Sequence, residues 1–537
     1  MLLIIRLSFV GPNWCNFIIL TLLIQSATPY SGPMSTAKIY SAIPFGFDGH
    51  LVAVECDANR GLPALNIVGL PSRSIDESRQ RIRSAINNSL FTFPASKLTV
   101  NLAPADIKKT GSHLDLPIAL SILVASSQLL QSDVEDKAFV GELALSGEIR
   151  PVRGIINIIE TAKRNHLKQL FIPADNAKQA ALVANDFQLI PVKNLREVWL
   201  QLKSISHISP LKQIVKNTEK DKHKHVLLDE ICGQSHAKRA ITIAVAGRHN
   251  ILFYGAPGIG KTMLAEAARD LMPPPTLNER IEITKLNSLI SSQSIIATTR
   301  PFRTPHHHIT ISNLIGGNQS LLPGEISLAH RGILFLDEFP EFTTHAIEAL
   351  RTPLESKQIT LSYLGNKITY PADFMLIAAM NPCPCGYLGT GIKECVCSPI
   401  SIQNYRKKLS GPILDRIDMT VMLDPLNTSV LLKNTTFSTQ QDASAKIQIQ
   451  RAIRQQHTRF HDNTIFNSAL SSSQIVQRLQ LTPSAKTLLD TAANKLQLSA
   501  RAYFKLIKVA QTIADLDQLP KIDEPQIAEA LSYRQPF

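Results

Sequence analysis

Residues 251–262 read ILFYGAPGIGKT, and this stretch decides how the middle of the chain folds. The four apolar residues at its start predict a short buried strand, and residues 263–272 (MLAEAARDLM) predict a helix that ends before Pro273. The glycines between them allow backbone N–H groups to surround phosphate oxygens at the positive end of that helix. We expect Lys261 to neutralise the β- and γ-phosphates of ATP and Thr262 to bind Mg²⁺. The predicted nucleotide contacts in this loop are Gly255, Ala256, Pro257, Gly258, Ile259, Gly260, Lys261 and Thr262.

The run GILFLDE at residues 332–338 supplies the second half of the expected site. Its consecutive apolar residues are typical of a strand buried on both faces of a parallel sheet. Polar residues that follow such a strand lie at the edge of the sheet where ligands bind. We therefore expect Asp337 to hold Mg²⁺ and Glu338 to orient or activate the attacking water.

The pattern along the rest of the chain predicts an α/β protein with several domains. Residues 34–202 alternate strand-like and helical stretches, and a second α/β region covers residues 227–430. Between them, residues 203–226 have no apolar periodicity and are predicted to form a basic linker. Residues 440–537 have apolar residues at helical spacing and are predicted to form a helical C-terminal domain.

Residues 1–33 form a separate N-terminal extension. Residues 17–24 (FIILTLLI) are apolar and resemble a weak signal peptide, but the run is too short to predict a membrane span. The alternative, which we favour, is a mis-assigned start with Met34 as the true initiator, because the downstream motifs are typical of intracellular nucleotide chemistry. No later segment is long and apolar enough to cross a bilayer, so we expect a cytoplasmic protein with no membrane partner.

The composition is that of a folded protein with a basic balance. Hydrophobic residues make up 44% and charged residues 18% of the 537, which excludes a wholly disordered or collagen-like chain. Lys and Arg total 56 against 43 Asp and Glu, and the resulting net charge of +13 favours polyanionic partners such as nucleic acid. The excess charge is spread along the chain and is densest in the linker, so charge alone is a weak argument for DNA binding.

Four of the seven cysteines lie within residues 383–397, a cysteine-rich insert in the second α/β region. Cys383, Cys385, Cys395 and Cys397 form the pattern C-x-C, nine residues, C-x-C. Four thiolates can bind Zn²⁺ tetrahedrally in a closed structural site. The C-x-C spacing is tighter than the usual C-x₂-C of zinc ribbons, so reduced free cysteines and disulfides remain alternatives.

Together with other stretches, these motifs resemble the AAA+ ATPases, and within them the magnesium-chelatase-like ComM/YifB family. The resemblance extends from Met34 almost to Phe537 and implies a P-loop ATPase core with a C-terminal helical lid. The stretches that carry it most specifically are NIVGLP (66–71), NLAPADIKK (101–109), FRTPHHH (302–308), PGEISLAHRGILFLDEFPEF (323–342), AAMNPCPCG (378–386), LSGPILDRID (409–418) and SARAYFKLIKVAQTIADL (499–516).

The resemblance also implies roles for four polar residues. Asn381 matches the sensor-1 position, where an amide binds the γ-phosphate or the attacking water. Arg416 matches the arginine finger, which reaches the nucleotide of the neighbouring subunit and offsets transition-state charge. Arg501 matches sensor 2, which couples the helical lid to the bound phosphates, and Gln234 would lie near the adenine. Considered without the matched motifs, Asn381 and the two arginines would be interpreted as ordinary salt-bridged or capping residues.

Two further segments match insertions of the family. The triplet His306, His307 and His308 is predicted to lie inside a loop or a pore; metal binding is the alternative, although no further ligands lie at metal spacing. Residues 358–374 alternate β-forming residues and predict a hairpin, and in related ring motors the equivalent hairpin points into the central channel. We expect Lys367, near its tip, to contact DNA phosphate, with a plain solvated lysine as the alternative.

The N-terminal region resembles the Lon protease domain, which has a ribosomal S5 domain 2-type fold, through residues 137–155. That protease uses a Ser–Lys dyad. Asp115 stands where the nucleophile should be and Ile156 stands where the lysine should be, so both groups needed for nucleophilic attack are missing. A shift of one register would place the nearby Ser112 there but would not restore the lysine. We therefore expect an interaction platform without protease activity.

Three functions are compatible with these features. The first is a ring-forming, hexameric ATP-driven motor that acts on single-stranded or branched DNA and promotes branch migration in homologous recombination or natural transformation, with recombination proteins as partners. The second is a metal-insertion motor like the ATPase subunit of magnesium chelatase. The third is a protein-remodelling ATPase that docks clients on its N-terminal domain. The full-length resemblance, the protease-like domain and the basic balance favour the first.

Overall fold

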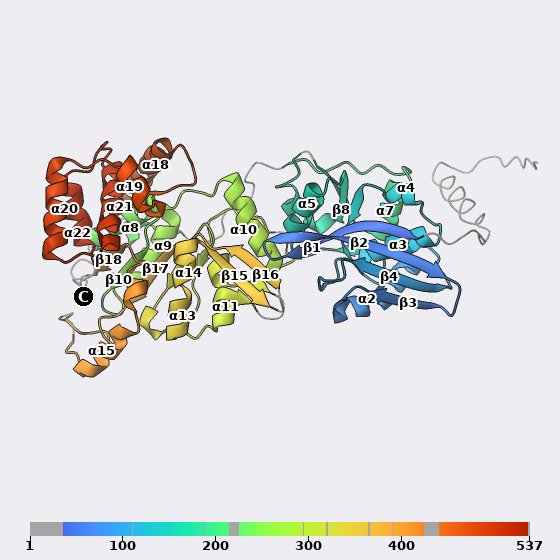
Figure 1. The fold of residues 1–537 in the computed structure, drawn as a ribbon, viewed down its shortest axis with the longest axis horizontal. Coiled ribbons are helices and arrows are strands. Elements are labelled where there is room, and N and C mark those ends of the chain that lie inside the picture. The colour runs from blue at the N-terminus through green and yellow to red at the C-terminus, as the bar shows by residue number, and fades with distance from the viewer. Residues whose placement is uncertain are drawn as a thin grey trace, which may run out of the picture.

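A computed structural model describes residues 36–534 apart from short gaps. The residues that it leaves out within this range are Thr110, Asp186, 214–224, Ser294, 318–320, 364–365, Thr390, Ile392 and 424–439. The expected N-terminal extension and residues 214–224 of the expected linker therefore lie outside the described residues. Figure 1 shows an elongated chain with an N-terminal α/β body at one end, a second α/β body in the middle and a helical bundle at the other end. None of the described helices combines the length and apolar character that crossing a bilayer requires.

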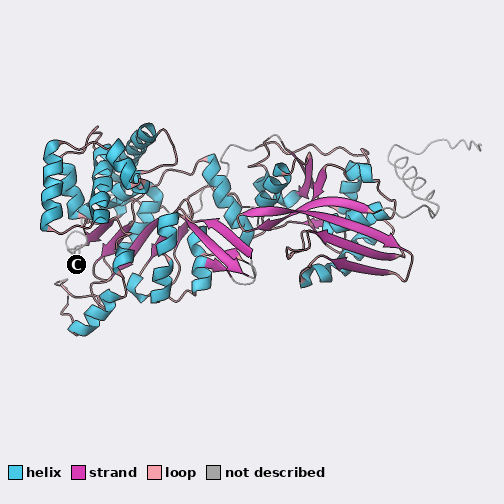
Figure 2. Cartoon of the chain, in the orientation of Figure 1, coloured by secondary structure: helices cyan, strands magenta, loops and turns pink. Residues whose placement is uncertain are grey.

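A seven-stranded mixed sheet forms the centre of the N-terminal body (Figure 2). Its strands lie in the order β3-β4-β2-β1-β5-β8-β9. The pairs β1–β2 and β2–β4 are antiparallel, and the other neighbours are parallel. In β2 and β4, buried side chains alternate with more exposed ones, because one face of the sheet packs on helices. The strands are β1 (Ala37–Phe45), β2 (Asp48–Asn59), β3 (Ala64–Val68), β4 (Lys97–Ala103), β5 (Lys137–Phe139), β8 (Gln169–Pro173) and β9 (Gln188–Val192).

The helix α3 (Asp115–Ala125) is the central helix of this body. All of its residues are buried, as expected for a helix that is apolar on every side. It packs on β1 and β2 and also against α2 (Arg73–Asn88). The remaining elements are a small hairpin of β6 (Glu142–Leu143) and β7 (Ile149–Arg150), and the helices α4 (Gln131–Val134), α5 (Ile155–Arg164), η1 (Ala174–Asn176), α6 (Ala177–Ala180) and α7 (Leu195–Leu202).

A five-stranded sheet in which all strands run parallel forms the middle of the molecule. The strands are, in spatial order, β11 (Phe302–Arg303), β14 (Ile333–Leu336), β17 (Met375–Met380), β10 (Ile251–Tyr254) and β18 (Met419–Met422). Every residue of the three central strands is buried, which fits their uninterrupted apolar sequences. Because β17 lies between β14 and β10, the residues that follow these three strands meet at one edge of the sheet.

Helices and two small hairpins surround this sheet. The predicted hairpin at residues 358–374 is present as an antiparallel ribbon of β15 (Gln358–Tyr363) and β16 (Asn366–Pro371), and a second short ribbon pairs β12 (Gly316–Gly317) with β13 (Leu322–Pro323). The helices are η2 (Leu228–Glu230), α8 (Ser235–Gly247), α9 (Lys261–Leu271), α10 (Leu277–Ile290), α11 (Ile311–Ile315), α12 (Glu325–Leu328), η3 (Phe339–Glu341), α13 (Thr344–Ala349), α14 (Arg351–Ser356), α15 (Pro399–Lys407) and α16 (Gly411–Leu414).

The C-terminal residues form a bundle of helices, as predicted, and the bundle shares its core with the parallel sheet. Its long helices α18 (Gln440–Phe460) and α21 (Ala500–Leu516) both pack on α8, which lies next to β18. The shorter members are η4 (Asn467–Ala469), α19 (Ser472–Arg478), α20 (Pro483–Lys495) and α22 (Glu524–Ser532). The domain boundaries expected from the sequence stay predictions, since several of them fall in or beside residues that the structure does not describe.

The N-terminal body is joined to the middle body through α5 and α10. Gly154 donates its N–H to Ser288 O at 2.9 Å, and Lys285 Nζ lies 2.5 Å from Glu160 Oε2. The same ammonium lies 4.1 Å from the ring centre of Phe47. These contacts pair polar groups of the two bodies, so the bodies are held by specific interactions and not only by the connecting chain.

Candidate nucleotide-binding site

The phosphate loop connects the carboxyl end of β10 to α9. Gly258 and Gly260 have φ angles of +75° and +94°, which L side chains rarely adopt, and space is open where a Cβ would lie. Gly255 lies in a more crowded place, where a Cβ would lie 2.4 Å from Ile259 Cδ1 and the isoleucine side chain would have to move. The loop therefore leaves an open backbone cradle at the N-terminus of α9, which is a geometry suited to phosphate.

Lys261 is the first residue of α9, and its side chain turns back under the loop. Its Nζ donates to Gly255 O at 2.8 Å and to Asn381 Oδ1 at 2.5 Å. Burial lowers the pKa of Lys261 to about 8, although the nearby carboxylates of Asp337 and Glu338 act in the opposite direction. The uncharged oxygens of Gly255 and Asn381 thus hold the ammonium group at the position where we expect it to meet the nucleotide phosphates.

Thr262 and Asp337 form the candidate magnesium site. Thr262 Oγ1 donates to Asp337 Oδ2 at 3.4 Å, although 75 positions separate the two residues in sequence. Both side chains are exposed. A hydroxyl and a carboxylate are oxygen donors of the kind that Mg²⁺ accepts, and they border the open phosphate cradle. The residues present therefore fit a magnesium–nucleotide complex.

The candidate catalytic residues Glu338 and Asn381 come just after β14 and β17, which are neighbouring strands of the sheet. Glu338 comes directly after Asp337, has a φ of +50°, and donates its N–H to Asp337 Oδ1 at 2.9 Å. Asn381 directly follows β17, and its amide oxygen accepts from Lys261. The parallel sheet therefore brings the phosphate loop, the two acidic residues and Asn381 to one edge, as the sequence motifs predict.

His307 lies beside the candidate catalytic carboxylate, a proximity that the sequence did not reveal. Its Nδ1 is 3.4 Å from Glu338 Oε2. The ring nitrogens of His306, His307 and His308 lie within 4.8 Å of one another, on the predicted insertion. This insertion thus touches the edge of the sheet where nucleotide would bind. Its function as a pore loop or a metal ligand stays a prediction.

Arg416 and Arg501 share one carboxylate. The NH2 nitrogens of both lie 2.6 Å from Glu355 Oε1, which belongs to α14. Hydrogen bonding from Arg416 holds the pKa of Glu355 below its usual range, and the charges of both arginines act in the same direction. Nothing in the sequence pattern singled out Glu355, because the three residues lie in separate segments: α14, the turn after α16, and α21.

The shared carboxylate lies in a cavity of about 170 Å³ between the middle body and the C-terminal bundle. Besides Glu355 and the two arginines, the cavity is lined by Lys505 and Lys508 from α21. No residue of the phosphate loop lines it. Within the described residues, the structure therefore places Arg416 and Arg501 together, but not with the loop of the same subunit.

Gln234 and Lys367 lie in different parts of the middle body. Gln234 precedes α8, is half-buried and has a φ of +51°. Lys367 is exposed on β16, opposite Ser362 of β15. Its neighbour Ile368 points to the other face of the ribbon, where it is buried. The roles predicted for Gln234 and Lys367 stay predictions.

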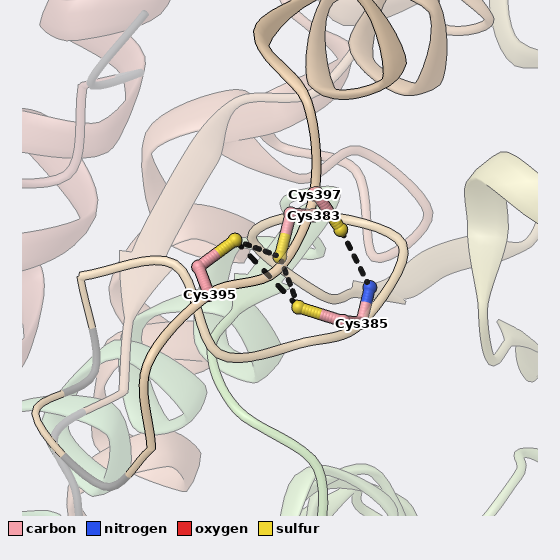
Figure 3. A group of neighbouring side chains, drawn as sticks. All are labelled: Cys383, Cys385, Cys395 and Cys397. Carbon is pink, nitrogen blue, oxygen red and sulfur yellow. Dashed lines mark hydrogen bonds between the residues drawn. The ribbon is translucent and has the colours of Figure 1, made fainter.

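The four clustered cysteines meet in space (Figure 3). Their sulfur atoms all lie within 4.8 Å of one another, and Figure 3 shows the side chains converging on a common point. Cys383 is buried and the other three, Cys385, Cys395 and Cys397, are half-buried. The predicted C-x-C pairs are thus brought together, and the cluster could hold a metal ion.

The positions of the missing protease dyad are both buried. Asp115 is paired with Arg81 at 3.0 Å, and burial raises its pKa to about 7 in spite of that pairing. Ile156 is fully buried in α5. Ser112 donates its hydroxyl to Glu142. These positions thus hold an ion-paired acid and an apolar side chain in the structure.

Three family models match successive parts of the chain. The model described as "Magnesium chelatase, subunit ChlI" matches residues 227–431, "Subunit ChlI of Mg-chelatase" matches 54–176, and "Magnesium chelatase, subunit ChlI C-terminal" matches 440–534. Competence protein ComM of Haemophilus influenzae is 42% identical over 506 residues, which cover 93% of this chain and 98% of that protein. The chain belongs to the magnesium-chelatase-like ComM/YifB family.

Other similar proteins extend this comparison. The uncharacterized protein YifB of Escherichia coli is 38% identical over 506 residues, which cover 93% of this chain and 97% of that protein. Lon protease 1 of Syntrophobacter fumaroxidans is 27% identical over 164 residues, which cover 29% of this chain and 19% of that protein. The similarity to Lon is therefore partial, whereas the similarity to ComM/YifB proteins covers nearly the whole chain.

Membership in the ComM/YifB family confirms the resemblance found in the sequence. The AAA+ character of this family implies ATPase activity with ATP and Mg²⁺, and the mixed α/β fold with its parallel sheet agrees with that class. The roles of individual residues are not established by family membership and stay predictions.

Proposed function

We propose that this protein is an ATP-driven DNA motor that assembles into a hexameric ring in the cytoplasm and promotes branch migration. The pathways would be homologous recombination and natural transformation, with recombination proteins as partners. The observation that carries the proposal is the convergence of Lys261, Thr262, Asp337 and Asn381 at one sheet edge. Similarity to a competence protein over 93% of the chain supports the choice of DNA as the substrate.

Lys261 and Asn381 would bind the triphosphate. The hydrogen bond between them directs the ammonium group of Lys261 toward the side-chain amide of Asn381, which directly follows β17. Incoming phosphate oxygens would replace the neutral carbonyl partners of the ammonium and restore its full charge. Thr262 and Asp337 would hold Mg²⁺, which neutralises charge on the transferred phosphate when it is bound.

Glu338 would orient the attacking water and accept its proton. Its side chain is exposed at the sheet edge, where a water can approach. His307 lies close enough to restrain this carboxylate, and loss of the contact would free it. A movement of the histidine-bearing insertion would therefore change the position of the general base, which offers a route from DNA contact to hydrolysis.

Arg416 and Arg501 would act on the nucleotide of the neighbouring subunit. The common carboxylate of Glu355 holds the two guanidinium groups side by side, in a cavity that no residue of the subunit's own phosphate loop lines. Triphosphate bound by the adjacent subunit would compete with Glu355 for both cations, because phosphate offers more charge and more acceptor oxygens. Complete sites would then form only in an assembled ring.

Lys367 would contact the DNA backbone. The outward face of its hairpin carries Thr360, Ser362 and Thr369 beside the lysine, while the inward face is apolar and buried. A lysine among hydroxyl groups can bind phosphates in succession without reading bases. Movement of this ribbon during the ATP cycle would translocate DNA independently of its sequence.

The matches to magnesium chelatase models favour a second candidate, a metal-insertion motor. The test is the steady-state ATPase rate of purified protein with and without single-stranded and branched DNA. The DNA-motor proposal predicts a higher rate with DNA. An unchanged rate, in protein that hydrolyses ATP and forms rings, would favour the chelatase-like function.

A further inference from the structure

The sulfur atoms of the cysteine cluster are spaced as metal ligands are. Cys383 Sγ lies 3.3 Å from Cys385 Sγ and 3.6 Å from Cys395 Sγ, and Cys385 and Cys395 are also 3.6 Å apart. A disulfide requires about 2.05 Å. Zinc–sulfur bonds of about 2.3 Å place tetrahedral sulfurs about 3.8 Å apart. The spacing in the structure is therefore close to that of a tetrathiolate site.

A backbone hydrogen bond also favours thiolate ligands. The N–H of Cys385 donates to Cys397 Sγ at 3.4 Å. Donation to sulfur stabilises its charged form, and donation to a metal-bound thiolate helps to fix the ligand in place. Each pair of cysteines thus contributes to the position of the other, as Figure 3 shows.

Two described apolar side chains beside the second cysteine pair are exposed. Val396, between Cys395 and Cys397, is 83% exposed, and Ile400, just after the pair, is 71% exposed. A segment that buries so little apolar surface gains little stability from packing. A bound metal would supply the missing cross-link, as structural zinc does in small domains that lack a core.

The first cysteine pair lies against the nucleotide site. Cys383 is two positions after Asn381. Gly386, which follows Cys385, packs on the phosphate loop, because a Cβ at Gly386 would lie 2.7 Å from two ring carbons of Pro257. Gly386 also donates its N–H to Cys383 O at 2.9 Å, which closes a tight turn. The cluster therefore lies beside both the phosphate loop and Asn381, the residue whose side-chain amide is predicted to bind the γ-phosphate.

We propose that Cys383, Cys385, Cys395 and Cys397 bind one Zn²⁺, and that this ion positions Asn381 against the phosphate loop for hydrolysis. The ion would neutralise part of the charge of four adjacent thiolates and fix the turn that carries Asn381. Zinc would act through Asn381 and would touch neither ATP nor water. The inference rests on the proposed ATPase function and adds a metal requirement to its catalytic step.

The first experiment measures metal content and kinetics of the full-length protein. Protein purified without chelators is expected to contain one zinc per chain, and Cys395→Ser is expected to lose it. Its kcat should fall about tenfold, as happens when the support of a catalytic group is removed, while its affinity for a fluorescent ATP analogue changes much less. Cys56→Ala, which removes a thiol from β2 of the N-terminal body, is the matched control and should retain both zinc and kcat.

The second experiment asks whether the metal acts through Asn381. Asn381→Ala and Cys395→Ser are combined, and kcat of the double variant is compared with the single ones. We expect the double variant to be no slower than Asn381→Ala alone. Multiplicative losses would overturn the positioning role. If the serine variant does not fold, reversible loss and recovery of kcat on zinc removal by a zinc-selective chelator and zinc re-addition replaces it.

The outcomes separate this inference from the proposed function. Active ATPase that contains no zinc and four titratable thiols overturns the zinc site and leaves the proposed function intact. A wild-type protein that holds zinc but does not hydrolyse ATP in any assembly state overturns the proposed function. Zinc loss that lowers ATP affinity as much as kcat overturns the assignment to Asn381.

Discussion

Lys261 Nζ lies 2.5 Å from Asn381 Oδ1, although the two residues are 120 positions apart. The lysine begins α9 and the asparagine directly follows β17, so the contact joins the phosphate loop to the end of the neighbouring strand of the parallel sheet. In the proposed function, this pair binds the γ-phosphate of ATP. The catalytic predictions start from this position.

Lys261→Ala and Glu338→Gln should fail at different steps. Loss of the ammonium should weaken ATP binding by about 2 kcal/mol, the scale of a hydrogen bond to a charged group. Glu338→Gln should bind ATP almost normally and hydrolyse it slowly, because the carboxylate acts only after binding. Equilibrium binding and single-turnover hydrolysis distinguish the two, and equal losses of affinity would count against both assignments.

ATP affinity should fall as the pH rises above about 8. Burial lowers the pKa of Lys261 to about 8, so the ammonium is charged below that pH and increasingly neutral above it. Phosphate raises this pKa again on binding, so each binding event at higher pH must take up a proton. Calorimetry in buffers of different ionisation enthalpy should detect this uptake near pH 8.5. Binding without proton uptake at that pH would contradict the prediction.

Arg416→Ala should bind ATP and fail to hydrolyse it. The guanidinium is held with Arg501 on Glu355 and is proposed to serve the next subunit, so binding in its own loop remains. Mixing Arg416→Ala with Lys261→Ala chains should restore part of the activity, because one intact site then forms at some interfaces. Inactive mixtures, with co-assembly demonstrated, would rule out action between subunits.

Lys367→Ala should lower the stimulation of the ATPase by DNA and leave the rate without DNA largely unchanged. The lysine is exposed on β16, and its removal should also reduce the salt dependence of DNA binding by about one phosphate contact. Lys486→Ala, which removes an exposed lysine from α20, is the matched control. The same loss in both variants would mean that general charge, and not the hairpin, mediates the effect.

The local parts of the site were predictable from the sequence. The strand Ile251–Tyr254, the glycine turn and the helix from Lys261 are encoded within one short stretch, and the apolar run before Asp337 specifies a buried strand. The C-x-C pairs likewise indicated a cluster that the structure brings together. In each case the chemistry depends on residues that are close in sequence.

The contacts between distant elements were not predictable in this way. Glu355 gave no signal, because its ion pairs with Arg416, in the turn after α16, and with Arg501, in α21, join segments that are far apart in sequence. His307 was assigned to a loop or pore, and its approach to Glu338 depends on how the insertion folds over the sheet edge. Pairings of this kind follow from tertiary structure and leave no spacing pattern.

The central claim is that ATP hydrolysis by this protein moves DNA strands. Its most direct test is a synthetic mobile Holliday junction incubated with wild-type protein and ATP, with Glu338→Gln as the control that binds but does not hydrolyse ATP. We expect conversion of the junction to its duplex products by the wild type only, together with a DNA-stimulated ATPase rate. Assembled, ATP-hydrolysing protein that leaves the junction intact and whose ATPase rate is unchanged by DNA would contradict the account.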